Sequence, residues 1–410
     1  MWRMAVRRCS RRLCCRNFST SFGDGGTVQA CTLVVPSPSD ALNRGRESAH
    51  IKMSEDPYLS VIQTASADDA VVTVVAVPWD ATMCTFEMTE RTIHQTPRRM
   101  VDFSPVVDSV DVDLIEFGLG EPTTFGLCVD FSIAAEVESL NEEAAVLLHP
   151  NSALSGDGGH PARTPEAVQR IEELYQAGSG AVERRFRQLF DEGRLGAVFG
   201  GDHSSPYGAI KAFGAHCASR GESFGILQFD AHADLYDSYD DVSCSHACVM
   251  KRVLDNVEAL DAVVAVGIRE VNSQELEAHS ADSRHHMFTA AHLRRASFAG
   301  GAEWERAVRA IVAPLPHHVW VSFDIDGLEL QFCDGTGTPV PGGLSYLQAT
   351  DVLLEIHRSG RVLCGFDVVE VGSTPAGVNV GVRLMYKLAG LQMLGLGARD
   401  NLQIRRPTLI

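Results

Sequence analysis

The sequence predicts an α/β protein, a three-layer α/β/α sandwich around a mainly parallel sheet. Apolar, strand-like segments alternate with segments of helical periodicity along most of the chain. The strand-like segments are apolar without interruption, as in a parallel sheet that helices cover on both faces. Short polar runs directly follow three of them, which is where such sheets carry their functional sites.

The first expected strand is Val71–Val77, a β-branched run that ends at a Pro-Trp-Asp turn. A long helical pattern covers 165–194, and the glycines at 178–180 are expected to divide it into two helices. Regular alternation follows. The later expected strands are Leu195–Phe199, Phe224–Phe229, Ala262–Gly267, His318–Phe323 and Val362–Val368. The expected helices are Pro206–Arg220, His246–Val257, Glu303–Ala313, Tyr346–Ser359 and a last one that includes Ala389–Leu396.

The two ends of the chain differ in composition from this region. Residues 1–22 are rich in arginine and hydroxyl side chains and lack acids, which is typical of a mitochondrial transit peptide and predicts the matrix as location. Residues 23–68 show little periodicity and are expected to be an irregular lead-in. One domain is expected over 70–400, followed by a C-terminal tail at 401–410.

Charge and composition exclude several classes of partner. The 410 residues carry a formal net charge of −18, which argues against binding to nucleic acid or to an anionic membrane. No apolar run approaches the roughly 20 residues that span a bilayer. The 11 cysteines are scattered without a Cys-x-x-Cys pair, so a reduced compartment is expected.

The three polar runs are Gly-Gly-Asp-His-Ser at 200–204, Asp-Ala-His-Ala-Asp at 230–234 and Asp-Ile-Asp at 324–326. Residues spaced by two point the same way in an extended chain, so the second and third runs can each present their ligands together. The candidate metal ligands are His203, Asp230, His232, Asp234, Asp324 and Asp326. Carboxylates outnumber imidazoles and no thiol is needed, which favours two Mn²⁺ ions per subunit over structural zinc. Such a pair of ions activates water, so a hydrolase is expected.

These motifs, in this order, resemble the ureohydrolase family, which includes arginase and agmatinase, and the resemblance covers about 70–400. It implies an arginase-like catalytic domain with a dimanganese centre that hydrolyses guanidino compounds to urea and an amine. It also implies a homo-oligomer, either trimer or hexamer. By motif, one ion would be held by His203, Asp230, Asp234 and Asp324, and the other by Asp230, His232, Asp324 and Asp326.

The resemblance also implies catalytic roles for His246, Asp326 and Glu370. His246 would pass a proton to the leaving amine and contact substrate. Glu370 would bind the guanidinium, a planar cation that suits a bidentate carboxylate. The Gly-Thr-Gly-Thr-Pro run at 335–339 is expected to shape the site.

The substrate is predicted from the segment that precedes His246. Ser-His-Ala at 245–247 matches neither the Asn-Leu-His-Gly of arginases nor the Asp-His-Gly of many agmatinases, and resembles a divergent agmatinase-like branch. The loop before it carries Asp237, Asp240 and Asp241 and no Lys or Arg, which favours a small guanidino substrate with a distal ammonium. Hydrolysis of agmatine to putrescine and urea is therefore expected. Two alternatives stay open: an arginase or other guanidino-acid ureohydrolase, and a metal-retaining binding or regulatory subunit without turnover.

Overall fold

A computed structural model describes residues 17–22, 26–31, 70, 72–83, 92–104, 111–115, 117, 127–149 and 163–397. The chain divides into two compact units, Met1–Pro57 and Tyr58–Ile410. In the first unit, β1 (Asn17–Phe22) pairs antiparallel with β2 (Gly26–Cys31), a pairing that the sequence analysis did not predict. Most of the predicted transit peptide and lead-in, and the whole predicted tail at 401–410, lie outside the described residues.

The second unit is built on an eight-stranded parallel sheet with the strand order β4-β3-β5-β10-β9-β6-β7-β8. This confirms the predicted fold class. The strands are β3 (Val72–Ala76), β4 (Leu127–Asp130), β5 (Leu195–Phe199), β6 (Phe224–Phe229), β7 (Leu260–Ile268), β8 (His285–Thr289), β9 (His318–Asp324) and β10 (Val362–Val369). All the predicted strands are present, whereas β4 and β8 at the two edges of the sheet were not predicted.

Helices cover both faces of this sheet. Their bounds are α2 (Thr96–Phe103), α3 (Val112–Ile115), α4 (Ala134–Leu148), α5 (Pro165–Asp191), α6 (Tyr207–Ser219), α7 (Val249–Asn256), α8 (Ser273–Ala281), α9 (Ala290–Phe298), α10 (Gly301–Val312), α11 (Tyr346–Arg358) and α12 (Pro375–Gly397). Short 3₁₀ helices are η2 (Ile93–Gln95), η5 (His246–Cys248), η6 (Ile325–Gly327) and η7 (Leu330–Phe332).

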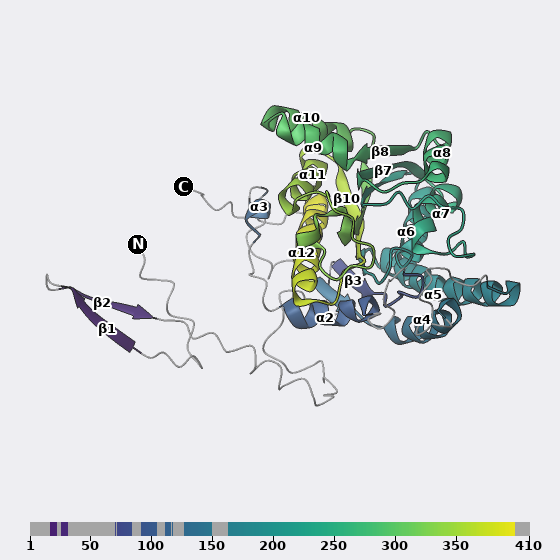
Figure 1. Ribbon diagram of the computed structural model, residues 1–410, viewed down its shortest axis with the longest axis horizontal. Helices are drawn as coiled ribbons and strands as arrows, with labels where there is room; N and C mark the ends of the chain where they lie inside the picture. The colour runs from purple at the N-terminus through teal and green to yellow at the C-terminus, as the bar shows by residue number, and fades with distance from the viewer. Residues whose placement is uncertain are drawn as a thin grey trace. The chain divides into compact units, whose positions relative to one another are not determined.

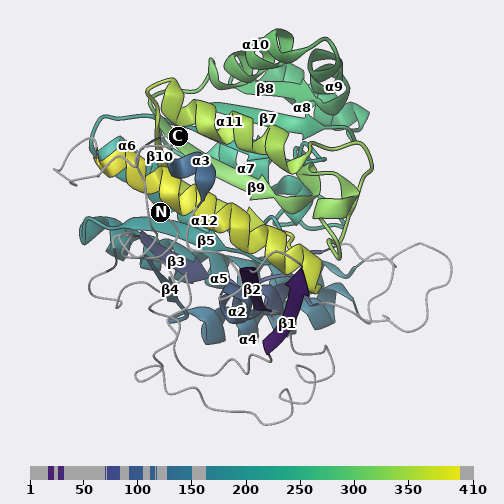
Figure 2. The ribbon, with the colours of Figure 1, turned by 90° about the vertical axis from the view of Figure 1, so that its left-hand side faces the viewer.

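The two faces are packed by different sets of helices. Helices α9 to α12 lie on one side of the sheet and α4 to α7 on the other (Figure 1), and Figure 2 looks onto the face that α11 and α12 cross. Neighbouring residues of β3 alternate between the two buried cores, with Val74 in one and Val75 in the other. Within the described residues, no helix is both long enough and apolar enough to span a bilayer.

Helix α5 is continuous from Pro165 to Asp191, so the expected break at its glycines is wrong. The glycines instead provide close packing. A Cβ on Gly178 would contact the ring of Trp79, and a Cβ on Gly208 of α6 would overlap the carbonyl oxygen of Ser179. Small residues on both helices let α5 and α6 approach at this point, and this packing outweighs the weak helix propensity of glycine.

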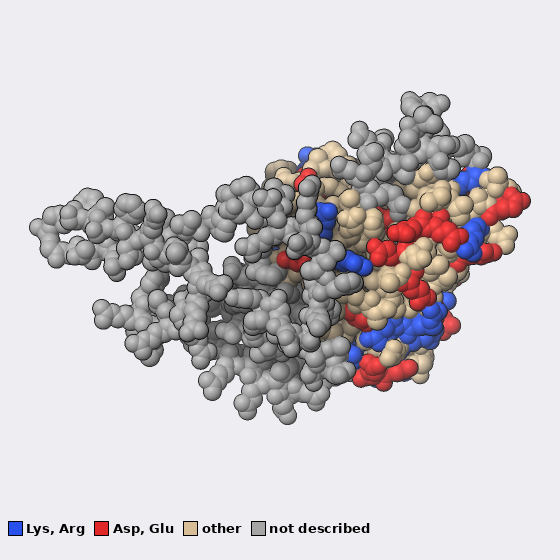
Figure 3. Space-filling model, turned by 90° about the horizontal axis from the view of Figure 1, so that it is seen from below, with Lys and Arg blue, Asp and Glu red and all other residues tan. Residues whose placement is uncertain are grey.

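The surface that includes α4 and α5 carries both signs of charge. Figure 3 shows acidic and basic side chains side by side on this face. Pairs such as Arg170–Glu143 at 2.8 Å and Arg184–Glu136 at 3.3 Å join the two helices. Both pairs are solvent-exposed, so each adds little to stability.

The strand order places the predicted site. Strands β5, β10, β9 and β6 are consecutive neighbours in the middle of the sheet. Glu370 follows β10, Asp324 ends β9, and Asp230 follows β6 directly, while His203 lies in the turn after β5. Because the strands are parallel, these four residues meet at the carboxyl ends of the central strands.

Candidate metal centre

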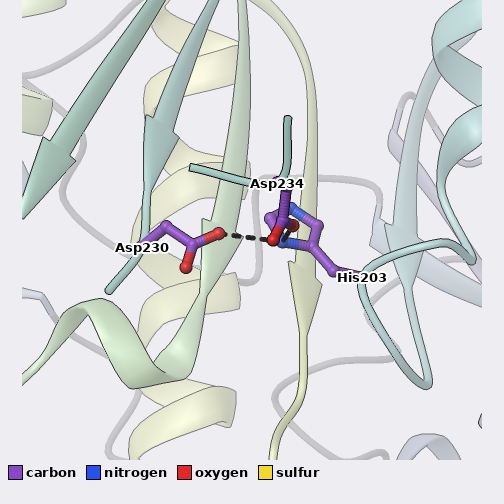
Figure 4. Close-up of side chains that lie close together, drawn as sticks. All are labelled: His203, Asp230 and Asp234. Atoms are coloured by element: carbon purple, nitrogen blue, oxygen red, sulfur yellow. Dashed lines mark ion pairs between the residues drawn. The ribbon is translucent and has the colours of Figure 1, made fainter. Parts of the chain in front are cut away.

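The six predicted ligands come together at the carboxyl ends of these strands. Two groups of side chains have ligand atoms within 4.8 Å of one another: the first is His203, Asp230 and Asp234, and the second is Asp230, His232 and Asp326. Asp230 belongs to both groups. Figure 4 shows Asp230 and Asp234 directed at the imidazole of His203.

The distances describe two adjoining cages. His203 Nδ1 lies 3.0 Å from Asp230 Oδ2 and 2.9 Å from Asp234 Oδ2. Asp324 Oδ2 is 3.4 Å from the same nitrogen, which brings the sixth ligand to the first group. In the second group, His232 Nδ1 lies 3.1 Å from Asp326 Oδ2 and 3.5 Å from Asp230 Oδ1. The carboxylates are buried and His232 is half-buried, so the centre is shielded but reachable.

The tautomer of His203 fits metal binding. Its Nε2 lies 2.9 Å from Ser322 Oγ, and that hydroxyl donates its proton to Asp367 Oδ1 at 2.8 Å. Ser322 must therefore accept from Nε2–H, so the neutral imidazole, the form that binds metal, carries its lone pair on Nδ1. Without metal, burial alone would lower the pKa of His203, but the Asp230 and Asp234 carboxylates raise it well above its ordinary value, so a proton takes the place of the cation. The buried Nδ1 has no hydrogen-bond partner among the described residues. A lone pair aimed at three carboxylates is the arrangement that a shared cation would satisfy.

The electrostatics of the site point the same way. Burial raises the pKa of Asp324 well above its ordinary value, and the charges of Asp326 and Asp230 raise it further. Burial alone would lower the pKa of His232, but hydrogen bonds to Asp230 and Asp326 raise it to about 12. So many carboxylates in a buried site demand positive charge. Two divalent ions fit this donor set, in which oxygen ligands predominate.

His246 begins η5 and is linked through Thr82 to Asp202, the residue before the ligand His203. Its backbone N–H donates to Thr82 Oγ1 at 3.0 Å, and that hydroxyl donates to Asp202 Oδ2 at 2.7 Å. Burial lowers the pKa of His246 to about 4, and the nearby imidazole of His232 contributes to the shift. The ring is therefore neutral at neutral pH and able to accept a proton. Asp202, within the first polar run, is not a ligand in either group but holds Thr82 in place.

Glu370 directly follows β10, in a backbone conformation that few residues adopt. Its φ is 57°, in the left-handed region, and its N–H donates to the Gly201 carbonyl at 2.8 Å. Its Oε1 accepts from the backbone N–H of His203 at 3.1 Å, whereas its buried Oε2 has no hydrogen-bond partner among the described residues. Burial raises the pKa of this carboxyl well above its ordinary value, and the charge of Asp202 adds to the shift. Strained backbone and an unsatisfied carboxylate oxygen are typical of a binding position.

Two further residues position the loop that carries Asp326. The guanidinium of Arg269 donates to the carbonyls of Asp326 at 2.6 Å, Leu328 at 3.3 Å and Val340 at 2.5 Å. Thr338, in the run at 335–339, donates to Asp326 Oδ2 at 3.4 Å. The run thus contacts a ligand, in keeping with its expected role. Arg269 was not predicted, because a single arginine after a strand carries no distinctive signal.

A buried network behind His203 was also missed. Both oxygens of Asp367 accept hydrogen bonds, one from Ser322 and the other from Trp320 Nε1 at 2.6 Å. Asp367 is fully buried in β10, and desolvation raises its pKa to about 6. The chain Trp320–Asp367–Ser322 thereby orients the imidazole of His203. Asp367 lies three residues before Glu370 in the sequence, but only the tertiary contacts show its function.

We expect Asp367→Asn to weaken Mn²⁺ binding about 10- to 100-fold, because one of its two donors would then face an amide N–H instead of an acceptor. Calorimetric titration of the metal-free protein with Mn²⁺ would measure this. Asp351→Asn is a matched control, since Asp351 accepts from the indole of Trp304 at 2.7 Å in the same way but lies on α11. Equal metal affinity in the two variants would contradict a positioning role for Asp367.

The acids of the loop have partners outside the two ligand groups. Asp241 Oδ2 accepts from the backbone N–H of Arg163 at 3.3 Å, and Asp240 Oδ2 lies 3.6 Å from the Arg163 guanidinium. Asp237 is 71% exposed and lies 3.7 Å from Lys251 Nζ. These acids therefore give little support to a distal ammonium, contrary to the reasoning from the loop's composition.

Comparison with known proteins now decides the family. A sequence model of the arginase family matches residues 156–390, more than half of the chain. The chain belongs to the arginase family. Among the curated relatives of this arginase-family protein is an agmatinase of Pyrococcus horikoshii, 27% identical over 70% of this chain and 94% of the relative. An N(1)-aminopropylagmatine ureohydrolase of Thermus thermophilus is 32% identical over 53% of this chain and 72% of the relative.

Solved structures agree on the fold of this arginase-family chain. The agmatine ureohydrolase of Thermoplasma volcanium covers 88% of it with a TM-score of 0.59 at 16% identity, and all of that chain is matched. Arginase from Bacillus cereus covers 78% with a TM-score of 0.55 at 20% identity, matching 98% of that chain. Together with the family match, the curated relatives support a hydrolase of guanidino C–N bonds as the general activity.

Proposed function

We propose that this protein hydrolyses agmatine to putrescine and urea with two Mn²⁺ ions per subunit. The observation that carries the proposal is the unsatisfied Glu370 Oε2, buried beside two ligand groups that share Asp230. A buried carboxylate oxygen without a partner suits a guanidinium N–H. The adjoining groups suit a pair of divalent ions, and their carboxylate-rich composition favours manganese.

In the proposed reaction each residue has a separate task. Glu370 binds the guanidinium and holds its central carbon over the metal ligands. The six ligands would hold the ions, which would supply activated water at neutral pH. His246, neutral because of its burial, takes up a proton and delivers it to the departing amine nitrogen. Asp326, a ligand of the second group, is held towards the reaction centre by Arg269 and Thr338.

The choice of agmatine is supported by the relatives, several of which are named agmatinase or aminopropylagmatine ureohydrolase. Arginine is the competing substrate, since a rabbit arginase is 26% identical over 59% of this chain and 77% of that relative.

Urea release from agmatine, arginine, guanidinobutyrate, guanidinopropionate and guanidine, measured with the Mn²⁺-loaded protein, tests the proposal. We expect the highest kcat/KM for agmatine. Faster turnover of arginine would overturn the choice of substrate. Binding of two Mn²⁺ without release of urea from any of these compounds would establish a binding or regulatory subunit instead.

Two properties of the whole protein belong to the proposal as well. The arginine-rich residues 1–22 support import into the mitochondrial matrix, and a cytosolic location of the tagged full-length chain would overturn this. Membership of the arginase family supports a homo-oligomer, trimer or hexamer, and a monomer in light scattering would contradict it.

A further inference from the structure

The helical segment that begins at His246 is capped from a distant part of the chain. Ser245 stands at the N-cap position of η5, but its hydroxyl makes no hydrogen bond to the helix backbone and lies instead 3.3 Å from His246 Nδ1. The first N–H groups of a helix have no acceptor within the helix, so that of His246 needs one from elsewhere. Thr82, which is 164 residues earlier in the chain, supplies it through Oγ1 at 3.0 Å.

The hydroxyl of Thr82 is oriented by Asp202. A backbone N–H can only donate, so Thr82 Oγ1 accepts from His246 and has its own proton left for another partner. That proton goes to Asp202 Oδ2 at 2.7 Å, and the backbone N–H of Thr82 donates to the same oxygen at 3.0 Å. Thr82 and Asp202 are both buried, and the low dielectric of the interior strengthens these hydrogen bonds. The link therefore has one direction, from His246 to Thr82 and from Thr82 to Asp202.

The backbone that carries Thr82 is fixed on two sides. The backbone N–H of Asp80 donates to Asn141 Oδ1 at 2.9 Å, and Asn141 Nδ2 donates to Asp80 Oδ1 at 3.0 Å. The carbonyl of Trp79 accepts from the backbone N–H of Asp202 at 2.7 Å. Because Asn141 belongs to α4 and Asp202 to the turn after β5, Thr82 is held against both.

We infer that Thr82 is a positioning residue for His246, and that it aligns this imidazole with the turn that carries the ligand His203. The inference rests on the proposed function, in which His246 delivers a proton to the departing amine, and deepens it. Thr82 belongs to neither ligand group and acts only through His246. Proton transfer needs the two heavy atoms within hydrogen-bond reach, so a shift of about 1 Å in the imidazole lowers the rate on the order of 10²-fold.

Thr82→Val removes the hydroxyl, and Thr82→Ser keeps it. We expect the valine variant to lower kcat for agmatine about 10- to 100-fold, with the KM and the affinity for Mn²⁺ little changed, because His246 loses its fixed position. The serine variant should recover most of kcat. The valine variant should still fold, since Asp202 keeps hydrogen bonds from the backbone N–H of Thr82 and from the N–H and hydroxyl of Ser204.

A double-mutant cycle separates positioning from general destabilisation. In a His246→Ala background, Thr82→Val should cause no further loss of kcat, because the group that Thr82 positions is already gone. Thr73→Val is the matched control, since Thr73 is a buried threonine of β3 whose Oγ1 accepts from Arg194 at 2.7 Å, and it should leave kcat unchanged. A further loss of about 10-fold or more in the His246→Ala background, or an equal loss from Thr73→Val, would overturn the inference.

Hydrogen exchange gives a readout that is independent of turnover. The backbone amide of His246 should exchange faster in Thr82→Val than in the parent protein, whereas Thr82→Ser should match the parent. Equal exchange in the parent and the valine variant would refute the inference. If the valine variant did not fold, Thr82→Cys would take its place, because a thiol is a weak hydrogen-bonding group. If the parent protein released no urea, the proposed function would fail, and exchange at His246 would still decide whether Thr82 positions it.

Discussion

Asp230→Asn is expected to reduce urea release by on the order of 10³-fold or more, because Asp230 belongs to both ligand groups. Its Oδ2 lies 3.0 Å from His203 Nδ1, and its Oδ1 accepts from the His232 N–H at 2.7 Å. A neutral amide at this position cannot balance the charge of two divalent ions, so both should be lost.

Thermal unfolding with and without Mn²⁺ would show this directly. A ligand at 100 times its Kd stabilises the folded state by about 2.7 kcal/mol, so the parent protein should melt higher with metal and the variant should not. Without metal, the variant should be less stable than the parent. Burial alone would raise the pKa of Asp230, but hydrogen bonds to His203 and His232 lower it below its ordinary value, so the charge of Asp230 stabilises the folded state at neutral pH. Asp237→Asn is the control, because Asp237 is 71% exposed. A variant that retained two ions and activity would show that Asp230 is not shared.

Glu370→Gln is expected to lower kcat/KM by about 10²- to 10³-fold while Mn²⁺ binding stays intact. The expected loss corresponds to removing the charge from one partner of a buried hydrogen-bonded ion pair. The amide oxygen of glutamine can still accept a hydrogen bond from the backbone N–H of His203, as Glu370 Oε1 does at 3.1 Å, so the fold should be preserved. Steady-state kinetics together with Mn²⁺ titration would separate loss of substrate binding from loss of metal.

A second measurement on this variant makes the role of Glu370 specific. Guanidinium, added as an inhibitor, should bind the parent protein and bind Glu370→Gln at least about 30-fold more weakly. If the variant lost Mn²⁺ as well, Glu370 would be supporting the ligands rather than the substrate. If guanidinium bound both proteins equally, the unsatisfied Oε2 would have another function.

Much of the fold follows from local pattern, and the errors have physical causes. The buried strands are apolar without interruption, which is why β5, β6 and β9 could be predicted almost to the residue. The edge strands β4 and β8 are short, with less regular sequences, and were missed. The continuity of α5 could not be predicted, because its glycines are explained by the approach of α6 and not by their own conformational preference.

The candidate site shows a similar division. The ligand residues could be named because their side chains follow strands at alternate positions, a signal contained in a few residues. Asp367 and Arg269 could not be named from the sequence, since each acts through a partner far away along the chain. The partner of Asp367 is Trp320, and that of Arg269 is the Asp326 carbonyl. The acids of the loop were misleading, because composition does not show that Arg163 contacts two of them. Its backbone N–H donates to Asp241, and its guanidinium lies near the Asp240 carboxylate.

The sequence by itself determined the class of fold and the identity of the ligands, because both depend on local alternation of apolar and polar residues. Only the tertiary structure decided that β5, β10, β9 and β6 are neighbours, and so that their ends form one centre. Strand order is set by packing between distant segments, which no local pattern records.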